Sequence, residues 1–421
     1  MRIYCSGIGG IGLSAYASYQ KAEGHEVLGS DQNQNILIEG IDVSLNQDGS
    51  NVPEDADLFV YTLALPEDHP ELEKAKELGI ECKTYFEALG DLTKDYKLIA
   101  VCGTSGKSST TAMAAKVLMD ANLDPSVILG TKTKDLDGKN WRKGDSNIFL
   151  IEACEYCNSF HHLSPNIVLL TNAYGDHFDA YSGIEEYEAS FKKFIEYIPS
   201  DGVLITHDDD SQCKKISKSA SCKVVNADEK SVLDLSMQVP GRHMQQNAVL
   251  VISLAETLGI DLDASYRSVN SYQGCWRRME FKGTTEIGAK VFDDYAHHPV
   301  EISETIVALH LAHKDRRLVC VFQPHTHDRT IKLYDQFLDA FKSADLVIIP
   351  NIYEARTDRD CEKVDVDKFV EDIKSGSSVE VINGKSLDNT VSILKNEVLK
   401  ENDLLVTMGA GDVTNIGEEL F

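Results

Sequence analysis

The segment KLIAVCGTSGKSSTTAMAAKVL, residues 97–118, contains an apolar run, a glycine turn and an alanine-rich stretch in that order. The apolar run Leu98–Cys102 favours a strand, and the alanine-rich stretch favours a helix. Backbone N–H groups in such a turn point inward, and the helix dipole adds positive potential, so the turn can hold a phosphate chain. The segment therefore predicts a phosphate-binding turn within an α/β domain.

The residues of this turn predict how a nucleotide would be held. Lys107 would reach the outer phosphates, and the hydroxyl of Ser108 would ligate Mg²⁺. Val101 stands where the full G-x-x-x-x-G-K-[ST] motif has its first glycine, so the loop is a shortened variant. An ordinary strand-to-helix turn is the alternative. The predicted phosphate-binding residues are Gly103, Thr104, Ser105, Gly106, Lys107, Ser108 and Ser109.

Length and pattern predict an α/β protein of three domains. A chain of 421 residues is too long for one ordinary core. Strand–turn–helix patterns predict a Rossmann-like domain at 1–95, a P-loop ATPase-like domain with a parallel sheet at 96–273, and a second Rossmann-like domain at 274–421.

Charge and composition exclude several partners. The formal net charge of −27 argues against nucleic acid and against anionic membrane surfaces, which both require basic patches. No apolar run is long enough to span a bilayer, and the N-terminus begins with a strand pattern, so we expect a cytoplasmic protein. We expect the pair Cys154 and Cys157 to be thiols without a redox or metal role.

The N-terminus carries a second glycine loop, between a strand at Arg2–Ser6 and a helix at Leu13–Glu23. Its sequence GIGGIG, residues 7–12, fits G-x-G-x-x-G, and Asp31 follows Gly12 by 19 residues. This is the dinucleotide fingerprint, and a nicotinamide-dependent oxidoreductase is one interpretation. The physical requirement is only a diphosphate at a helix N-terminus and an acidic residue near a ribose or a base.

Polar residues follow two predicted strands of the central domain, Asn147–Ala153 and Asn166–Asn172. Ligands of parallel sheets lie at the carboxyl ends of strands, so we expect Glu152 and His177 to face the phosphate loop and to bind Mg²⁺ or Mn²⁺. Alternatively, Glu152 caps a loop and His177 lies on the surface. Asn247, near the start of a predicted helix, either reads a base or caps that helix.

The C-terminal third repeats the doubly wound pattern. Its polar segments at strand ends include DDYAHH and QPHTHDR. A helix is predicted at Val300–Ala312, and another, in the N-terminal domain, at Pro66–Leu78. The strands expected in this third are Lys290–Tyr295, Arg317–Phe322, Asp345–Pro350, Ser378–Asn383 and Asp403–Met408.

Taken in order, these motifs resemble the Mur ligases over essentially the whole chain. The segments that carry the resemblance are GIGGIGLS, GTSGKSSTT, EACEYCNSF, TNAYGDHFD, PGRHMQQNA, WRRMEF, DDYAHHP, FQPHTHDRT and GAGDV. The resemblance implies an ATP-dependent ligase of peptidoglycan precursor synthesis whose substrates are ATP, UDP-N-acetylmuramate and L-alanine. It also implies that the first loop binds the UDP-sugar through Gly7, Gly9, Gly10, Ile11, Gly12, Asp31 and Thr62.

The resemblance further implies roles for single residues. Lys107 would cover the β- and γ-phosphates, Ser108 and Glu152 would hold one Mg²⁺, and His177 would hold a second. Asn247 would lie at the adenine, Asp294 at the ribose, and Arg277 or Arg278 at the phosphates. Arg329 and His298 would orient substrate. For Arg277, Arg278 and His298, ion pairing between domains or helix capping is the alternative.

The resemblance leaves three questions open. Thr326 stands where the family usually has an arginine, and His327 could substitute in part, so the contacts with the amino acid or the muramyl group could differ from those of the family. A murein tripeptide could replace L-alanine, and a non-catalytic regulator could keep the fold. Either a monomer or a homodimer is compatible with the sequence.

Overall fold

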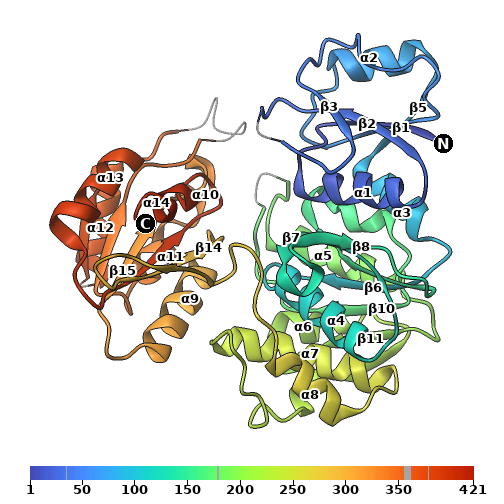
Figure 1. Ribbon diagram of the computed structural model, residues 1–421. Coiled ribbons are helices and arrows are strands. Elements are labelled where there is room, and N and C mark those ends of the chain that lie inside the picture. Colours follow the sequence, from blue (N-terminus) through green and yellow to red (C-terminus); the bar gives the residue numbers. More distant parts are fainter. Residues whose placement is uncertain (35, 178–179, 355–361, 378) are drawn as a thin grey trace. The chain divides into compact units, whose positions relative to one another are not determined.

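The computed structural model describes residues 1–34, 36–177, 180–354, 362–377 and 379–421 (Figure 1). The chain forms two compact units, which we describe separately. Unit 1 comprises Met1–Tyr174, Glu185–Leu235 and Asn247–Tyr272, and unit 2 comprises Gly175–Ile184, Ser236–Gln246 and Gln273–Phe421. Unit 1 contains two of the described β-sheets and unit 2 contains the third, so the predicted α/β class is confirmed.

The N-terminal sheet of unit 1 has five parallel strands in the order β3-β2-β1-β4-β5. Helices α1 and α3 cover one face, where Ile3 and Leu13 are buried, and α2 covers the other, where Tyr4 and Leu72 are buried (Figure 1). The elements are β1 (Arg2–Ser6), α1 (Ile11–Ala22), β2 (Glu26–Ser30), β3 (Asp42–Ser44), β4 (Leu58–Tyr61), α2 (Pro70–Glu77), β5 (Glu81–Thr84) and α3 (Tyr85–Thr93).

Helix α2 begins later than the sequence predicts. The expected helix ran from Pro66 to Leu78, but the observed one begins at Pro70, with His69 in extended backbone before it. A proline inside a helix lacks the N–H donor and clashes with the carbonyl four residues earlier, whereas at the first helical position it costs nothing. Pro70 therefore sets the helix start.

A fully buried carboxylate on α2 holds β1 and β2 together behind the first glycine loop. Glu71 accepts hydrogen bonds from Tyr4 Oη at 2.7 Å, Ser6 Oγ at 2.5 Å and Ser30 Oγ at 2.7 Å. Ser6 ends β1 directly before Gly7. The three hydroxyls satisfy a charge that would otherwise be costly to bury.

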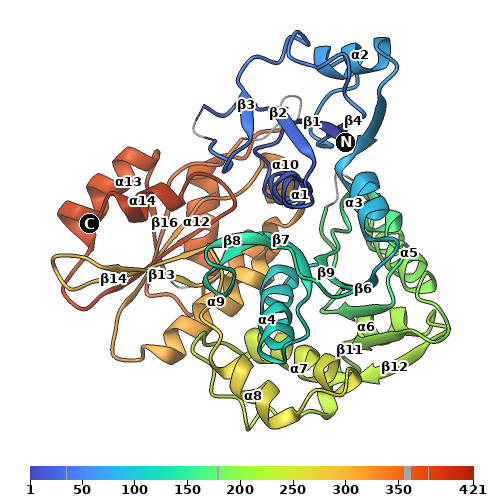
Figure 2. The ribbon, with the colours of Figure 1, turned by 45° about the vertical axis from the view of Figure 1, so that its right-hand side comes forward.

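The central sheet of unit 1 has the order β12-β11-β10-β6-β9-β7-β8 and is parallel except for β8, which pairs antiparallel with β7. Helix α4 packs against it, and α8 packs on α4, where Ser268 donates to Asp120 at 2.6 Å (Figure 2). The strands are β6 (Lys97–Cys102), β7 (Ser126–Thr133), β8 (Lys139–Arg142), β9 (Ile148–Glu152), β10 (Ile167–Leu170), β11 (Val203–Thr206) and β12 (Lys223–Asn226). The helices are α4 (Lys107–Asp120), α5 (Ile184–Glu196), α6 (Ser211–Ser217), α7 (Arg242–Thr257) and α8 (Leu262–Asn270), with short 3₁₀ turns at Lys134–Leu136, Tyr156–His162 and Ala227–Glu229.

The two sheets of unit 1 are joined through α1. Asn140 on β8 donates to the carbonyl of Ile11 at 2.6 Å, and Tyr19 Oη lies 3.1 Å from Ser126 Oγ on β7. These contacts fix the helix that follows the first glycine loop against the edge of the central sheet.

Unit 2 contains a six-stranded sheet in the order β13-β14-β18-β15-β16-β17. Val319 and Val321 of β15 point to a core under α13 and α14, whereas Phe322 packs on Phe337 of α11 on the other face. The elements are β13 (Glu280–Thr284), β14 (Lys290–Asp294), α9 (Pro299–Ala312), β15 (Leu318–Phe322), α10 (His327–Lys332), α11 (Tyr334–Asp339), β16 (Leu346–Ile349), α12 (Val366–Ser377), β17 (Glu380–Asn383), α13 (Leu387–Ile393), a π-helical turn at Leu394–Val398, β18 (Leu404–Met408) and α14 (Thr414–Glu418). The antiparallel edge strand β13 was not expected, and Ser378 of the predicted strand 378–383 lies outside the described residues.

Removing the buried charge should loosen the N-terminal sheet. A glutamine offers one acceptor oxygen where Glu71 serves three hydroxyl donors. We therefore expect Glu71→Gln to lower the free energy of local opening at β1 and β2 by about 1–3 kcal/mol. Hydrogen exchange of these strands, followed by mass spectrometry, measures the effect.

The matched control is Glu73→Gln, because Glu73 lies on the exposed side of the same helix. Equal exchange rates in both variants would contradict a stabilising role for the Glu71 network.

Candidate functional site

The turn predicted to bind phosphate connects β6 to α4 at the carboxyl end of a central strand of the sheet. Gly103 has φ +141° and Gly106 has φ +82°, values that other residues rarely adopt. A Cβ atom on Gly103 would lie 2.0 Å from Thr171 Oγ1, and one on Gly106 would lie 2.7 Å from Asn247 Oδ1. Both positions therefore require glycine, and the structure places Asn247 against the turn.

The end of β10 holds this turn in shape. The N–H groups of Thr104 and Ser105 donate to the carbonyl and side-chain oxygens of Asn172, at 3.2 and 2.9 Å. Thr171 Oγ1 donates to the carbonyl of Ser105 at 2.6 Å. Thr171 and Asn172 were not among the site residues predicted from the sequence, and only their position at a strand end could have suggested them.

Lys107 lies over the turn with its ammonium directed at oxygen atoms. Its Nζ donates to the carbonyls of Gly103 at 2.5 Å and Thr104 at 3.0 Å, and it lies 2.9 Å from Oε2 of Glu155. The Glu155 side chain has no exposed surface. Burial alone would lower the pKa of Lys107, but the Glu155 carboxylate raises it overall, so the lysine is charged.

Ser108 and Glu152 form a donor set that fits Mg²⁺. Ser108 Oγ lies 3.0 Å from Glu152 Oε1, which is about the separation of two adjacent ligands in an octahedron with 2.1 Å bonds. The N–H of Gly130 donates to Glu152 Oε2 at 2.9 Å and fixes the carboxylate. Val101 pairs with Glu152 across the sheet, so the strand, and not a longer loop, occupies the position of the missing glycine.

The first glycine loop brings together several of the residues predicted there. The N–H groups of Gly7 and Ile8 donate to the carbonyl of Ser30, at 2.8 and 3.0 Å. The N–H of Gly9 donates to Oδ2 of Asp31 at 2.8 Å, so the carboxylate already binds one backbone donor of the loop. A Cβ atom on Gly7 would lie 2.5 Å from Thr62 Cγ2.

Close packing also explains the last glycine of this loop. Helix α1 begins at Ile11, and a Cβ atom on Gly12 would lie 2.9 Å from the Tyr85 ring of α3. Gly10 precedes the helix in extended backbone and forms no side-chain cap. The helix N-terminus thus lacks a side-chain cap, which suits an anion-binding loop.

In unit 2, a buried ion pair joins the segment after β10 to α10. Arg329 Nη2 lies 3.1 Å from Asp176 Oδ1, and its Nη1 lies 3.2 Å from His325 Nδ1. Burial opposes ionisation of Asp176, but Arg329 lowers its pKa overall, with His177 and His297 adding to the effect. His177 has φ +54°, and its Nε2 lies 3.9 Å from Asp176 Oδ2. Phe178 and Asp179 lie outside the described residues.

His297 is a second buried titratable group beside Arg329. Burial and, to a smaller extent, the neighbouring Arg329 guanidinium lower its pKa from 6.5 to about 4, against the opposing effect of the Glu301 and Asp176 carboxylates. Its Nδ1 lies 3.0 Å from the carbonyl of Tyr295. The imidazole is therefore neutral at pH 7, with Nδ1 as the donor.

Two predicted site residues of unit 2 accept hydrogen bonds from backbone N–H groups. His298 Nδ1 accepts from the N–H of Val300 at 3.3 Å and caps α9, which was the alternative considered for it. Asp294 accepts from the N–H groups of Met279 and Ala296, each at 2.7 Å, and burial raises its pKa to about 6. Their predicted contacts with substrate stay predictions.

Arg277 and Arg278 differ in their surroundings. The Arg277 guanidinium pairs with Asp293 at 3.0 Å and donates to the carbonyls of Gly409 and Gly411, so it holds a turn within unit 2. Arg278 lies over the Tyr295 ring, with its Cζ 5.0 Å from the centroid. Of the two arginines, Arg278 is therefore the one that we still predict to contact the phosphates.

The sequence around Thr326 is also explained by local structure. Thr326 has φ +68°, caps α10 by accepting from the N–H of Arg329, and donates its own N–H to the carbonyl of Tyr353. His327 is buried, and its Nδ1 accepts from the N–H of Val364 at 3.0 Å. The idea that His327 substitutes for an arginine therefore has no support from its position.

The described residues thus place the predicted ligands in two sets. Lys107, Ser108, Glu152 and Asn247 lie together in unit 1, and His177 and Arg329 lie near Asp176 in unit 2. Within the described ranges, no three His, Cys, Asp or Glu side chains are placed to hold a metal ion by themselves. None of the helices described combines the length and apolar character needed to cross a membrane.

Three family models match consecutive parts of the chain. The model described as Mur ligase family, catalytic domain, matches residues 2–97, the Mur ligase middle domain matches 101–238, and the Mur ligase, glutamate ligase domain, matches 277–411. These models give no support to the nicotinamide interpretation of the first glycine loop.

Similar proteins span the whole chain. UDP-N-acetylmuramate--L-alanine ligase of Clostridium novyi is 37% identical over 99% of this chain and 96% of that protein, and the Clostridium perfringens enzyme of the same name is 35% identical over 99% and 97%. The crystal structure of UDP-N-acetylmuramate-alanine ligase from Thermotoga maritima superposes with a TM-score of 0.82 at 26% identity, covering 100% of this chain and 98% of that one. A murein peptide ligase from Psychrobacter arcticus shares the fold, with a TM-score of 0.74 at 22% identity over 100% and 98%.

Acid should destabilise unit 2 through His297. The unfolded imidazole binds a proton below pH 6.5, whereas the folded one stays neutral down to about 4. Stability is therefore present above pH 6.5 and is lost as the pH falls toward 4. Between pH 7 and pH 5 we expect wild type to lose about 2 kcal/mol more than His297→Gln.

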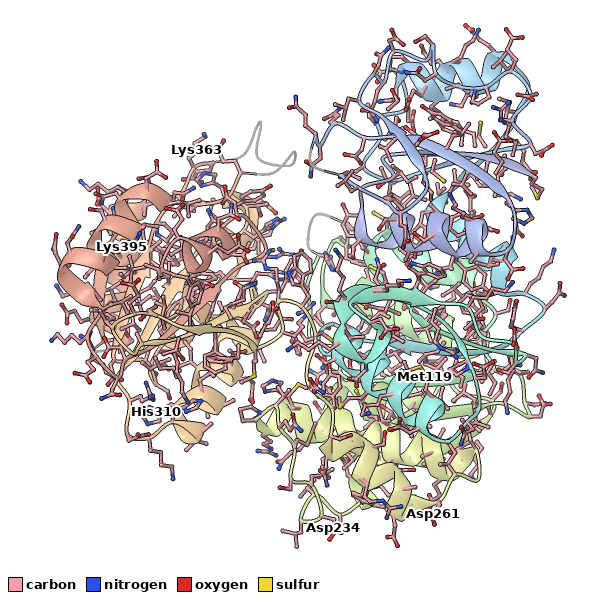
Figure 3. All side chains as sticks on the ribbon, viewed as in Figure 1. Met119, Asp234, Asp261, His310, Lys363 and Lys395 are labelled. Carbon is pink, nitrogen blue, oxygen red and sulfur yellow. The ribbon has the colours of Figure 1, made fainter. Side chains whose placement is uncertain are left out.

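Urea unfolding followed by Trp276 fluorescence, with Trp141→Phe in all chains, measures this difference. The control is His310→Gln, because His310 is an exposed histidine on α9 (Figure 3). The same loss in wild type and His297→Gln would refute the assignment.

Proposed function

Because the chain belongs to the Mur ligase family, we propose that it is an ATP-dependent ligase that joins L-alanine to the lactyl carboxylate of UDP-N-acetylmuramate. The reaction is a step of peptidoglycan precursor synthesis, and through it the enzyme serves cell shape and division. The observation that carries the proposal is the short phosphate turn, in which Lys107 and the Ser108–Glu152 pair lie together. Identity of 37% over 99% of the chain to an enzyme of that name supports the choice of substrates.

The chemistry explains why ATP is required. A carboxylate is a poor electrophile, so the lactyl carboxylate first attacks the γ-phosphorus of ATP, displaces ADP and forms an acyl phosphate. The free amino group of L-alanine then attacks the acyl carbon, and phosphate leaves from a tetrahedral intermediate. The first step brings an anion to a polyanion, so catalysis depends on charge neutralisation and alignment.

In unit 1, the phosphate turn would meet the nucleotide. Lys107 would donate hydrogen bonds to the β- and γ-oxygens, and Asn247 would lie beside the nucleotide at Gly106. Ser108 and Glu152 would hold Mg²⁺, and we assign His177 to a second ion. A bound divalent cation neutralises charge that develops on the phosphate oxygens.

The first glycine loop would hold the diphosphate of UDP-N-acetylmuramate. It has backbone donors and a helix N-terminus but no lysine, so it suits binding more than transfer of a phosphate. Asp31 would then lie near the uridine. Arg329 would orient substrate from unit 2 as a charged partner for a carboxylate, in place of Asp176.

We place the reaction in the cytoplasm and propose that the protein acts as a monomer or a homodimer.

Within the family, a murein tripeptide is the competing substrate. Phosphate release with UDP-N-acetylmuramate, ATP and Mg²⁺ tests both, since L-alanine alone among single amino acids should support turnover. Turnover with the tripeptide but not with L-alanine would overturn the proposed substrate.

Loss of the turn lysine should remove activity. We expect Lys107→Ala to lower the rate of phosphate release by about 10²–10³-fold, because a charged donor to the transferring phosphoryl group stabilises the transition state. The control is Lys116→Ala, since Lys116 lies on the same helix and pairs with Asp120 and Asp135. Near wild-type turnover in Lys107→Ala would exclude this turn as the ATP site.

The division of labour between the two loops is testable by binding alone. Asp31→Ala should weaken the binding of UDP-N-acetylmuramate and leave the affinity for ATP unchanged. Calorimetry with each ligand measures both, with Asp42→Ala as the control for an exposed aspartate of the same sheet. An equal loss for both ligands would contradict separate sites.

A further inference from the structure

Glu155 is a buried carboxylate that the proposed mechanism does not use. It follows β9 by three residues, and its side chain has no exposed surface. Its Oε2 lies 2.9 Å from Lys107 Nζ, and its Oε1 accepts from the same ammonium at 3.1 Å. Burying a carboxylate is costly unless it has a charged partner and hydrogen bonds, and here the partner is the lysine of the phosphate turn.

A second contact ties Glu155 to the turn from the side of α5. Tyr187 Oη donates to Glu155 Oε1 at 3.3 Å and lies 2.9 Å from Thr104 Oγ1. Thr104 Oγ1 in turn donates to the carbonyl of Tyr174 at 2.5 Å. One carboxylate is thus linked both to the lysine and, through a tyrosine, to the backbone that would surround the phosphates.

The ammonium of Lys107 has three protons, and each of them already has an acceptor. Two go to the carbonyls of Gly103 and Thr104, and the third goes to Glu155. A nucleotide phosphate that binds Lys107 must therefore compete with an existing acceptor. The carbonyls belong to the turn itself, so the acceptor that carries a full negative charge is Glu155.

We propose that Glu155 is the resident counter-ion of the phosphate turn, which Lys107 shares with or gives up to the nucleotide, so that this carboxylate limits nucleotide affinity and speeds product release. The inference rests on the proposed function, because it assumes that ATP and ADP bind at this turn. It assigns Glu155 as a positioning residue and not as a catalytic one.

The sign of the effect separates this role from a merely structural one. A negative charge on the far side of the same ammonium repels the phosphates and weakens the hold of Lys107 on them. Glu155→Gln keeps the shape and an acceptor oxygen but removes the charge. Bound phosphates then replace Glu155 as the negative charge that keeps Lys107 protonated, so ADP should bind more tightly, by on the order of tenfold. AMP lacks the β-phosphate that Lys107 contacts, so its affinity should change less than threefold.

Two variants complete the design. Tyr187→Phe keeps the charge and removes one hydrogen bond to it, so the carboxylate holds Lys107 more strongly and ADP should bind two- to threefold more weakly. Glu188→Gln is the matched control, because Glu188 is the next residue on α5, is also buried, and pairs with Lys192 and Lys215. It should leave both affinities unchanged.

Calorimetric titration of the full chain with ADP and with AMP, in the presence of Mg²⁺, measures these affinities. Tighter ADP binding by Glu155→Gln, with AMP unchanged, supports the proposal. Weaker or unchanged ADP binding by Glu155→Gln would overturn it, as would parallel changes for AMP. If Glu155→Gln does not fold, tighter ADP binding by Tyr187→Phe overturns the proposal in its place. Failure of wild type to bind ADP would instead count against the proposed function.

Discussion

The hydrogen bonds of Lys107 are the interaction on which the central site depends. A charged ammonium lies in a turn with two glycines at positive φ, held by the turn's own carbonyls and by a carboxylate without solvent exposure. The carboxylate and the other residues that complete the site follow strands that neighbour β6. Strand β9 leads to Glu152 and Glu155, and β10 leads to Asn172. The parallel sheet therefore assembles the site by bringing the carboxyl ends of three strands together.

The two glycine loops of unit 1 share one plan and differ in chemistry. Behind each lies a fully buried carboxylate, Glu71 in the N-terminal sheet and Glu155 in the central one. Glu71 binds three neutral hydroxyls, so it reinforces the strands and takes no part in the proposed binding of an anion by the loop. Glu155 instead binds the Lys107 ammonium, to which the proposed function assigns the nucleotide phosphates. This contrast fits a loop that binds a diphosphate and a turn at which phosphate is transferred.

Local motifs in the sequence predict much of the fold and several residues of the central site. Gly103, Lys107 and Ser108 follow from a strand–turn–helix pattern, and Glu152 follows from the rule that ligands lie at strand ends. The start of α2 was predicted four residues early because the cost of Pro70 inside a helix was not applied. Burial was harder to foresee, since Glu71 lies in a stretch of charged residues that reads as an exposed helix.

Partners distant in sequence could not be found from patterns at all. Arg329 and Asp176 are 153 positions apart, and nothing in either segment indicates the pair. His298 and Asp294 stand in a motif that resembles a substrate site, yet their polar atoms hold backbone N–H groups. A motif therefore predicts where chemistry occurs, whereas the division between contact and support depends on packing.

The central claim is that ATP activates the lactyl carboxylate as an acyl phosphate. The most direct measurement uses UDP-N-acetylmuramate labelled with ¹⁸O in both carboxylate oxygens, with unlabelled ATP and L-alanine. The account predicts one ¹⁸O atom in each phosphate released and one in the new amide, read by mass spectrometry. Phosphate without ¹⁸O, in a reaction that forms the amide, would contradict it.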